Sequence, residues 1–201
     1  MNTLAAAHPV HLTIDYPDRA LDRPSTLLRA LYAAPIVILL ALVDGSWSGG
    51  AAAGGVLMLP VLLTILFRQK YPRWWFDFHL QLARFSTRVV AYLALMSDRY
   101  PSTDEPQSVH LDIAYPNVRE DLNRWLPAVK WLLAVPHYIA LLFLGSAAVL
   151  AVVGAWFAVL ATGRYPRRIF AFVEGVLRWA LRVHAYAFLL VTDRYPPFSL
   201  D

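Results

Sequence analysis

Six Tyr-Pro dipeptides divide this chain into two halves that repeat the same order of residues. The dipeptides use six of the ten tyrosines and stand three in each half. They are Tyr16-Pro17, Tyr71-Pro72, Tyr100-Pro101, Tyr115-Pro116, Tyr165-Pro166 and Tyr195-Pro196. A repeated order of this kind predicts a tandem duplication of one unit of about 100 residues, so the chain builds its fold twice.

The segments around these dipeptides match between the two halves as well. Residues 10–17 align with 109–116, residues 70–73 with 164–167 and residues 97–101 with 192–196, and Arg23, Arg29, Pro35, Arg84 and Arg88 align with Arg124, Lys130, Pro136, Arg178 and Arg182. The order is kept along the whole chain, although the second half runs two residues longer before Arg124. We therefore expect repeat one over residues 1–101 and repeat two over residues 102–201.

The composition indicates a membrane protein. The chain is 58% hydrophobic and only 16% charged, with a mean hydropathy of +0.47, which is too apolar for an ordinary soluble domain. The absence of cysteine excludes disulfides and thiolate metal sites. The first 20 residues hold no apolar core of a cleavable signal peptide, so we expect insertion to rely on internal helices.

Two apolar segments in each repeat resemble membrane spans. The predicted spans are residues 27–43 and 51–67 in repeat one and residues 126–144 and 149–161 in repeat two. They lie near the short end of the roughly 17–25 residues that a crossing needs. The short links at 44–50 and 145–148 predict antiparallel helical hairpins.

A third helix in each repeat is strongly amphipathic. It is predicted at residues 72–97 and 166–192, where a proline stands in the first turn. Charged residues recur every fourth position, as at Glu174, Arg178 and Arg182, and aromatic residues occupy other faces. This pattern is typical of a helix that lies in the membrane interface.

Residues 10–16 and 109–115 alternate strictly between apolar and polar side chains, which predicts a half-buried strand at the start of each repeat. A lone strand has unpaired edges, so we expect the two strands to pair with each other. The predicted fold is an all-α membrane protein with four spans. Each of its two parallel repeats holds a short strand, a transmembrane hairpin and an interfacial helix.

The distribution of charge predicts the orientation of the chain. With two spans per repeat, all 18 Lys and Arg residues fall on one side of the membrane. The positive-inside rule then places both termini and both amphipathic helices in the cytoplasm. Because each repeat crosses an even number of times, the repeats are related by a pseudo-twofold axis along the membrane normal.

The second half carries a resemblance to a known family. Residues 165–170, Arg178-Trp179, Arg182, Ala185-Tyr186 and residues 192–199 resemble the bacterial membrane family catalogued as domain of unknown function 4389. Repeat one resembles it more loosely, because Pro101-Ser102-Thr103 stands where the family has Pro-Pro-Phe-Ser. The resemblance covers nearly the whole chain in two copies. It implies an integral membrane protein, which we expect in the bacterial inner membrane, and it implies no activity.

Basic and aromatic residues of the amphipathic helices form the predicted lipid-binding site. They are Arg73, Trp74, Arg84, Arg88, Arg167, Arg168, Arg178, Trp179 and Arg182. Anionic headgroups are the expected partners, because each cation near a membrane surface contributes about 1 kcal/mol. We expect no nucleic-acid binding, since a membrane would cover the interleaved aromatic residues. The alternative is a salt-bridged cytoplasmic platform, in which Asp77 and Glu174 neutralise part of the charged stripe.

Of the six histidines, only His11 and His110 are matched between the repeats. If they face each other on paired strands, they are weak candidates for a metal site, with a solvated sheet face as the simpler explanation. We place His137 near the cytoplasmic end of a span and His79 and His184 on helix surfaces. The matched Asp98 and Asp193 are interpreted either as paired acid groups or as polar residues that end helices.

The sequence favours a protein without catalytic activity. It holds no Gly-rich phosphate loop, HExxH motif or Gly-x-Ser-x-Gly elbow, so we expect no enzyme and no cofactor. The favoured function is an accessory or scaffold subunit that binds lipid and packs against a larger membrane protein complex. Two alternatives stay open: a small transporter or channel on the pseudo-twofold axis, and a membrane enzyme or metal site at His11 and His110.

Overall fold

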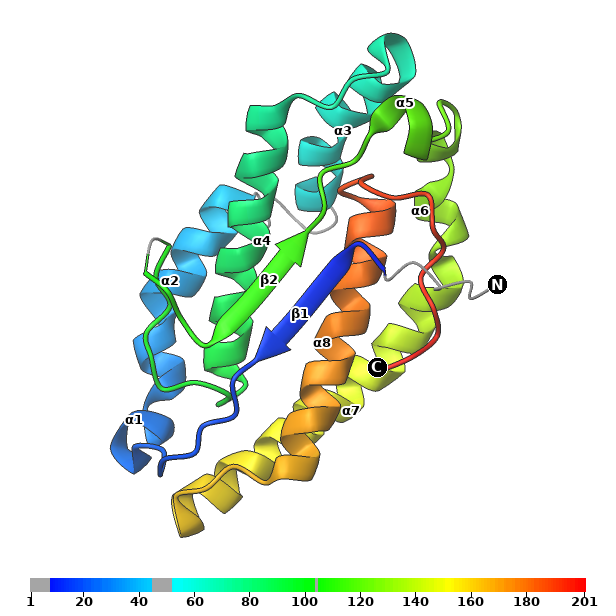
Figure 1. The fold of residues 1–201 in the computed structure, drawn as a ribbon. Helices are drawn as coiled ribbons and strands as arrows, with labels where there is room; N and C mark the ends of the chain where they lie inside the picture. The colour runs from blue at the N-terminus through cyan, green and yellow to red at the C-terminus, as the bar shows by residue number, and fades with distance from the viewer. Residues whose placement is uncertain (1–7, 45–51, 104) are drawn as a thin grey trace.

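The computed structural model describes residues 8–44, 52–103 and 105–201. In chain order the elements are β1 (Val10–Ile14), α1 (Arg23–Leu27), α2 (Arg29–Asp44), α3 (Ala52–Arg68), α4 (Arg73–Leu93), β2 (Val109–Ile113), α5 (Val118–Asp121), the 3-10 helix η2 (Leu126–Ala128), α6 (Lys130–Leu133), α7 (Val135–Thr162) and α8 (Arg167–Ala187). The described chain is mainly helical and contains a two-stranded sheet (Figure 1).

The two strands pair with each other in an antiparallel sheet, which confirms the prediction from their alternating sequences. Val10, Leu12 and Ile14 of β1 point into the core, as do the equivalent residues of β2, and the polar residues between them are exposed. Leu12 stands opposite Leu111, its match in the other half, so the register is symmetrical about this pair. Each strand ends two residues before a Tyr-Pro dipeptide, earlier than predicted.

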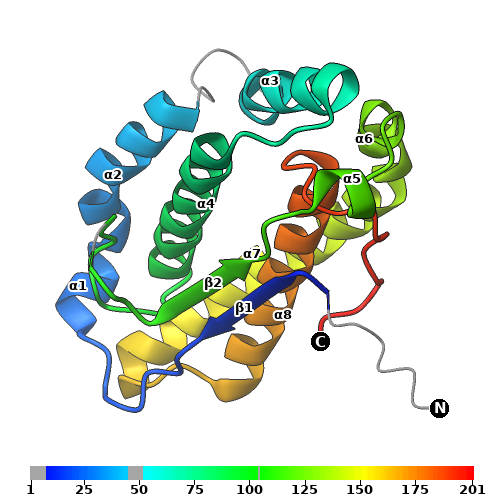
Figure 2. The ribbon, with the colours of Figure 1, turned by 45° about the horizontal axis from the view of Figure 1, so that its top comes forward.

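The fold has three layers, which are the sheet, then α4 and α8, then α2 and α7 (Figures 1 and 2). Each half contributes one strand to the sheet and one helix to each of the two helical layers. α4 packs against β2, and α8 packs against β1. α2 then packs on α4, and α7 runs along α8 on the side away from the sheet. The main apolar core fills the space between these layers. As a result, the helices predicted to lie in a membrane interface are sandwiched between the sheet and an outer helical layer.

The amphipathic helices α4 and α8 each begin one residue after a Tyr-Pro dipeptide. They end at residues 93 and 187, before the predicted ends at 97 and 192. Leu95 and Leu190 follow these ends with φ angles of 64° and 57°. A residue in the left-handed region cannot continue a right-handed helix, so the chain leaves the helix at this point in both halves.

The second half contradicts the predicted transmembrane hairpin. Residues 145–148, the predicted link between spans 126–144 and 149–161, lie inside the continuous 28-residue helix α7. The link sequence Gly-Ser-Ala-Ala contains no proline, and apolar residues flank it on both sides, so the helical hydrogen bonds continue through it. Residues 126–133 form η2 and α6 before α7 begins.

In the first half, helices occupy both predicted spans, as α2 and α3. Most of the predicted link between them, at residues 45–50, lies outside the described residues. Among the described residues, α2 makes its main contacts with α4, and α3 makes its main contacts with η2.

The prediction of four membrane spans is not supported. In the described part of the chain only α7 is long and apolar enough to cross a membrane, with a mean hydropathy of 2.3 in its most apolar window. At about 1.5 Å per residue it measures roughly 42 Å, against about 30 Å for the hydrocarbon core of a bilayer. α2 and α3, with 16 and 17 residues, are shorter than that core.

Candidate functional site

The central arginines of α4 and α8 point to the sheet and hydrogen-bond to its edges. Arg84 Nε donates to the carbonyl of Leu111 at 2.8 Å, and Arg84 Nη2 donates to Asp112 at 2.8 Å. Arg178 Nε donates to the carbonyl of Leu12 at 3.2 Å. Each strand therefore receives a cation from the helix of the other half, at positions that match in the sequence.

Glu174 completes the edge of β1. Its carboxylate accepts from the backbone N–H of Ile14 at 3.1 Å and from Arg178 Nη2 at 3.0 Å. Arg178 Nη1 also donates to the carbonyl of Leu200 at 3.0 Å. An exposed strand edge leaves donors and acceptors unpaired, and hydrogen bonds to ionised groups are the stronger kind. The pair thus satisfies the strand and holds the C-terminal segment.

The tyrosines of the Tyr-Pro dipeptides make a second matched pair of contacts across the halves. The Tyr16 hydroxyl donates to the carbonyl of Tyr165 at 2.5 Å. The Tyr115 hydroxyl donates to the carbonyl of Tyr71, also at 2.5 Å. The Tyr71 hydroxyl itself donates to the carbonyl of Leu189 at 3.0 Å, and burial raises the pKa of this phenol. The dipeptides therefore join the end of each strand to the start of the other half's amphipathic helix.

Each half also holds one buried cation near the end of its own amphipathic helix. Arg29 pairs with Asp98, and Lys130 Nζ lies 2.6 Å from Asp193. Burial lowers the pKa of Lys130, and the carboxylate of Asp193 opposes that shift. Asp98 further accepts from a backbone N–H of the segment before α1. Both carboxylates are thus engaged in structural contacts, in keeping with helix-ending polar residues.

Four of the predicted lipid-binding residues are exposed where α4 and α8 begin. They are Arg73, Trp74, Arg167 and Arg168. The guanidinium of Arg73 lies 4.6 Å from the ring centre of Tyr115, and that of Arg167 lies 4.8 Å from the ring centre of Tyr16. Carboxylates also lie near both arginines, since Arg73 is 3.4 Å from Asp77 and Arg167 is 3.9 Å from Asp18, but these side chains remain exposed at the surface.

The other three predicted residues lie deeper in the fold. Arg88 Nη1 donates to the carbonyl of Ser102 at 2.6 Å. Burial, together with the nearby charge of Arg178, lowers the pKa of Arg182. Trp179 is buried, and its indole N–H donates to His137 Nδ1 at 3.1 Å.

His11 and His110 lie on the exposed face of the sheet, as the simpler explanation expects, and they are not directly opposite each other. The register places His11 opposite Asp112 and His110 opposite Thr13. His110 Nε2 lies 3.2 Å from the carboxylate of Asp15. In the ranges that the structure describes, no group of three or more His, Asp or Glu residues is arranged to hold a metal ion.

His79 is buried, with 4% of its surface exposed, which contradicts its prediction as a helix-surface residue. Burial lowers its pKa to about 4. Burial, and to a smaller extent His79, also lowers the pKa of His184 to about 4. Both rings are therefore neutral at pH 7. Sequence reasoning assigned one buried face to these helices, whereas α4 and α8 have neighbours on two sides.

An aromatic cluster around His137 was not predicted. His137 is buried rather than interfacial, and its ring stacks on Phe198 with ring centres 4.0 Å apart. Tyr195 and Trp179 pack on other sides of the imidazole. The signal in the sequence was Phe198, three residues after Tyr195, in the segment that returns to cover the start of α7.

The outer helices expose large apolar side chains to the surroundings. They include Leu31, Ile38, Leu39 and Leu42 on α2, Leu59, Leu63 and Phe67 on α3, and Ile139, Leu142, Phe143, Val149, Leu150, Val153 and Phe157 on α7. Only 11% of the most apolar window of α7 is buried, whereas the core helix of a soluble protein is mostly buried. Exposed apolar surfaces of this extent mark contact with a membrane or another protein.

Comparison with known proteins places one match in the second half of the chain. Residues 127–199, which contain α6, α7, α8 and the segment after it, match the model of a domain of unknown function (DUF4389). No curated protein and no solved structure matches the chain. The match includes the residues of the second half that carry the family resemblance, and it supports the family through this one copy.

Proposed function

We propose that this chain is an integral membrane protein that serves as a non-catalytic accessory or scaffold subunit of a larger membrane complex. The observation that carries this function is the exposed apolar layer of α2, α3 and α7. Water does not stabilise such a surface, so it is embedded in lipid hydrocarbon or covered by other membrane proteins.

The polar groups of the chain support a structural rather than a catalytic role. Asp98 and Asp193, the matched acids, are held by Arg29 and Lys130. Arg84 and Arg178 are committed to strand carbonyls. These charged side chains stabilise the fold, and their hydrogen-bonding capacity is directed at the protein's own backbone.

We further propose that the chain arose by duplication of one unit, with the two copies related by a pseudo-twofold axis. The support is the recurrence of several contacts at matched positions, as in Arg84 with Leu111 and Arg178 with Leu12. The symmetrical strand register about Leu12 and Leu111 agrees with the same axis.

The proposed location is the inner membrane of a bacterium, with both termini on the cytoplasmic side. The polar face of the sheet lies opposite the outer helical layer, so it faces water when that layer faces the membrane. Arg73, Trp74, Arg167 and Arg168 are the exposed groups offered to anionic headgroups. The other proposed partners are further membrane protein subunits, and we propose no binding to nucleic acid.

Photo-crosslinking in native membranes tests this function. A photoreactive amino acid is placed at Phe143 or Leu150, which are 71% and 73% exposed, and at Val159, which is 0% exposed, as the matched control on the same helix. We expect Phe143 and Leu150 to crosslink to lipid and to one recurrent membrane protein. We expect Val159 to crosslink only within the chain.

Alkaline extraction of the membranes and purification in mild detergent complete this experiment. The membrane assignment fails if the chain is released by alkaline carbonate like a peripheral protein. The accessory role fails if the chain stays in the membrane but purifies alone and crosslinks only to lipid or to its own copies.

A further inference from the structure

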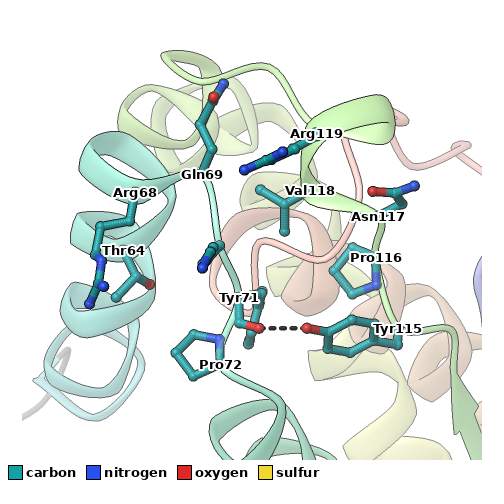
Figure 3. A pocket seen from close by; sticks show the side chains of 11 residues that line it. Thr64, Arg68, Gln69, Tyr71, Pro72, Tyr115, Pro116, Asn117, Val118 and Arg119 are labelled. Carbon is teal, nitrogen blue, oxygen red and sulfur yellow. Dashed lines mark hydrogen bonds between the residues drawn. The ribbon is translucent and has the colours of Figure 1, made fainter.

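A pocket of about 570 Å³ opens between the end of α3 and the short helix α5 (Figure 3). The joined pair Tyr71 and Tyr115 lies at its base. Three cations line it, namely Arg68, Lys70 and Arg119, together with the uncharged polar residues Thr64, Gln69 and Asn117. None of the described residues that line the pocket is Asp or Glu.

The three cations of this pocket lack protein partners within the described ranges. Elsewhere a cation such as Arg29 is neutralised by a carboxylate. The side chains of Arg68, Lys70 and Arg119 make no hydrogen bond or ion pair with any described residue. Like charges gathered at one pocket repel each other, and an anion placed among them is attracted by all three.

The matching turn in the first half is closed and carries an acid. Asp18 stands where the second half has Asn117, and its carboxylate lies 3.9 Å from Arg167. The backbone N–H of Leu21 donates to the carbonyl of Gly163 at 2.8 Å, which holds the turn against the end of α7. The turn after β1 therefore holds a carboxylate at the position where the turn after β2 has the uncharged Asn117.

The longer spacing of the second half falls at this same place. Arg124 follows Tyr115 by nine residues, whereas Arg23 follows Tyr16 by seven, and the longer segment forms α5, which carries Arg119. Gln69, with a φ angle of 47°, takes the position in the first half that Gly163 takes in the second half. That conformation favours glycine, so a side chain is kept there against its preference. At this place the two halves therefore differ in the length of the segment after the strand, in the charge at Asp18 and Asn117, and in the side chain at Gln69 and Gly163.

We infer that this pocket binds a phosphate-ester anion and that an anionic phospholipid headgroup is the source that fits it best, which rests on the proposed membrane location. Arg68 is the last residue of α3, and Phe67 beside it is exposed. An acyl chain along the apolar side of α3 brings its phosphate to the pocket mouth. Arginine and lysine bind phosphate oxygens through charge-assisted hydrogen bonds.

Lipid binding to the full chain in detergent and in nanodiscs tests this inference. Native mass spectrometry measures retained phosphatidylglycerol, and nanodiscs of phosphatidylcholine with and without phosphatidylglycerol measure preference. The triple variant Arg68→Gln, Lys70→Gln, Arg119→Gln removes the cations, and Arg19→Gln with Arg164→Gln is the control in the matching turn. We expect the triple variant to bind phosphatidylglycerol roughly tenfold more weakly or worse, and the control to keep the affinity of the parent chain.

The outcomes distinguish a lipid headgroup from a soluble phosphate ester, and they distinguish failure of the pocket from failure of the membrane location. Retained phosphatidylglycerol that depends on the three cations supports a lipid headgroup. Binding of inorganic phosphate that depends on them, without retained lipid, supports a soluble phosphate ester. Equal binding by the triple variant and the parent overturns the site. If the chain inserts into phosphatidylcholine, shows no preference for phosphatidylglycerol and binds no inorganic phosphate through the three cations, the pocket inference fails while the membrane location stands.

Discussion

At the scale of single residues, the half-buried charges of α4 and α8 serve the backbone of this molecule. Arg84 and Arg178 reach strand carbonyls, and Glu174 accepts a strand N–H. A two-stranded sheet is marginal by itself because both of its strands are edges. Charged side chains from α4 and α8 take the place of further strands at both edges.

Removal of one such side chain should therefore destabilise the fold. In Arg178→Gln, the carbonyls of Leu12 and Leu200 lose their donor, and Glu174 stays behind without its cation. We expect a loss of roughly 2–4 kcal/mol in the free energy of unfolding, measured by denaturant titration in detergent. Arg168→Gln, at an exposed position of the same helix, should change it by less than about 0.5 kcal/mol. Equal effects of the two variants would contradict the bracing role of Arg178.

The neutral histidine of α4 predicts a dependence of stability on pH. The pKa of His79 falls from 6.5 to about 4 on burial, so between these values the unfolded chain binds a proton that the folded chain does not. Its contribution is complete above pH 6.5 and is lost as the pH falls, with a slope of roughly 1.4 kcal/mol per pH unit. Burial lowers the pKa of His184 in the same way, so His79→Leu should reduce the slope of the parent chain by this amount rather than abolish it, in thermal unfolding measured between pH 7 and pH 4. Phe78→Leu should keep the full slope. A slope in His79→Leu equal to that of the parent would show that the ring is protonated in the fold.

The sequence predicts which positions are charged but does not predict what the charges meet. The stripe that contains Arg84, Arg178 and Arg182 suits lipid phosphates and strand carbonyls equally, because both are oxygen acceptors of similar reach. The choice depends on where β1 and β2 lie, and their pairing joins residues about 100 positions apart in the chain. The basic pocket was missed for the same reason, since Arg68 and Arg119 come from different halves.

At the scale of elements, two helices of the same half use glycine in opposite ways. A Cβ built on Gly175 of α8 would lie 2.8 Å from the carbonyl oxygen of Leu200, so α8 needs glycine for the C-terminal segment to pass. A Cβ on Gly154 of α7 would meet no atom within 4 Å. Gly175 is therefore part of a close contact, whereas Gly154 lies on an open face.

These two glycines make a matched test of the packing on α8. Gly175→Ala should destabilise the fold by roughly 1–3 kcal/mol, because the backbone of Leu200 must move. Gly154→Ala should stabilise it by roughly 0.5–1 kcal/mol, because alanine is the better helix former. Thermal unfolding of both variants checks the signs, and a stabilising Gly175→Ala would mean that the C-terminal segment does not rest on α8.

Elements with a clear period were predictable, and the interruption of an apolar run was not. The alternation around Leu12 and Leu111 identified both strands, and the charged stripes identified α4 and α8. At residues 145–148, the small residues predict a link, but alanine and serine remain in helices when no proline intervenes, and α7 continues through them. The first half differs at the matching place, because its link at residues 44–50 contains three glycines.

At the scale of the whole molecule, the two halves exchange their contacts. The helix of each half braces the strand of the other, through Arg84 with Leu111 and Arg178 with Leu12. The strands themselves form one sheet across the halves. Neither half encloses a complete core, because each contributes a strand to a shared one.

Division of the chain should consequently abolish folding of the separate parts. Residues 1–101 and 102–201, expressed alone, should aggregate or be degraded, and their co-expression should restore a stable complex that purifies through a tag on either part. Protease resistance of each fragment, alone and together, measures this. A fragment that folds alone with the protection of the full chain would show that the exchanged contacts contribute little.

The same exchange has a consequence during synthesis. β1 leaves the ribosome near the beginning of the chain, but Arg178, which braces it, follows Leu12 by 166 residues. At roughly 5–20 residues per second, the strand waits on the order of 8–30 seconds for that partner. During this interval its edge is open to pairing with other chains. The pace of translation, rather than the stability of the finished fold, therefore sets how long the newborn protein is exposed to aggregation.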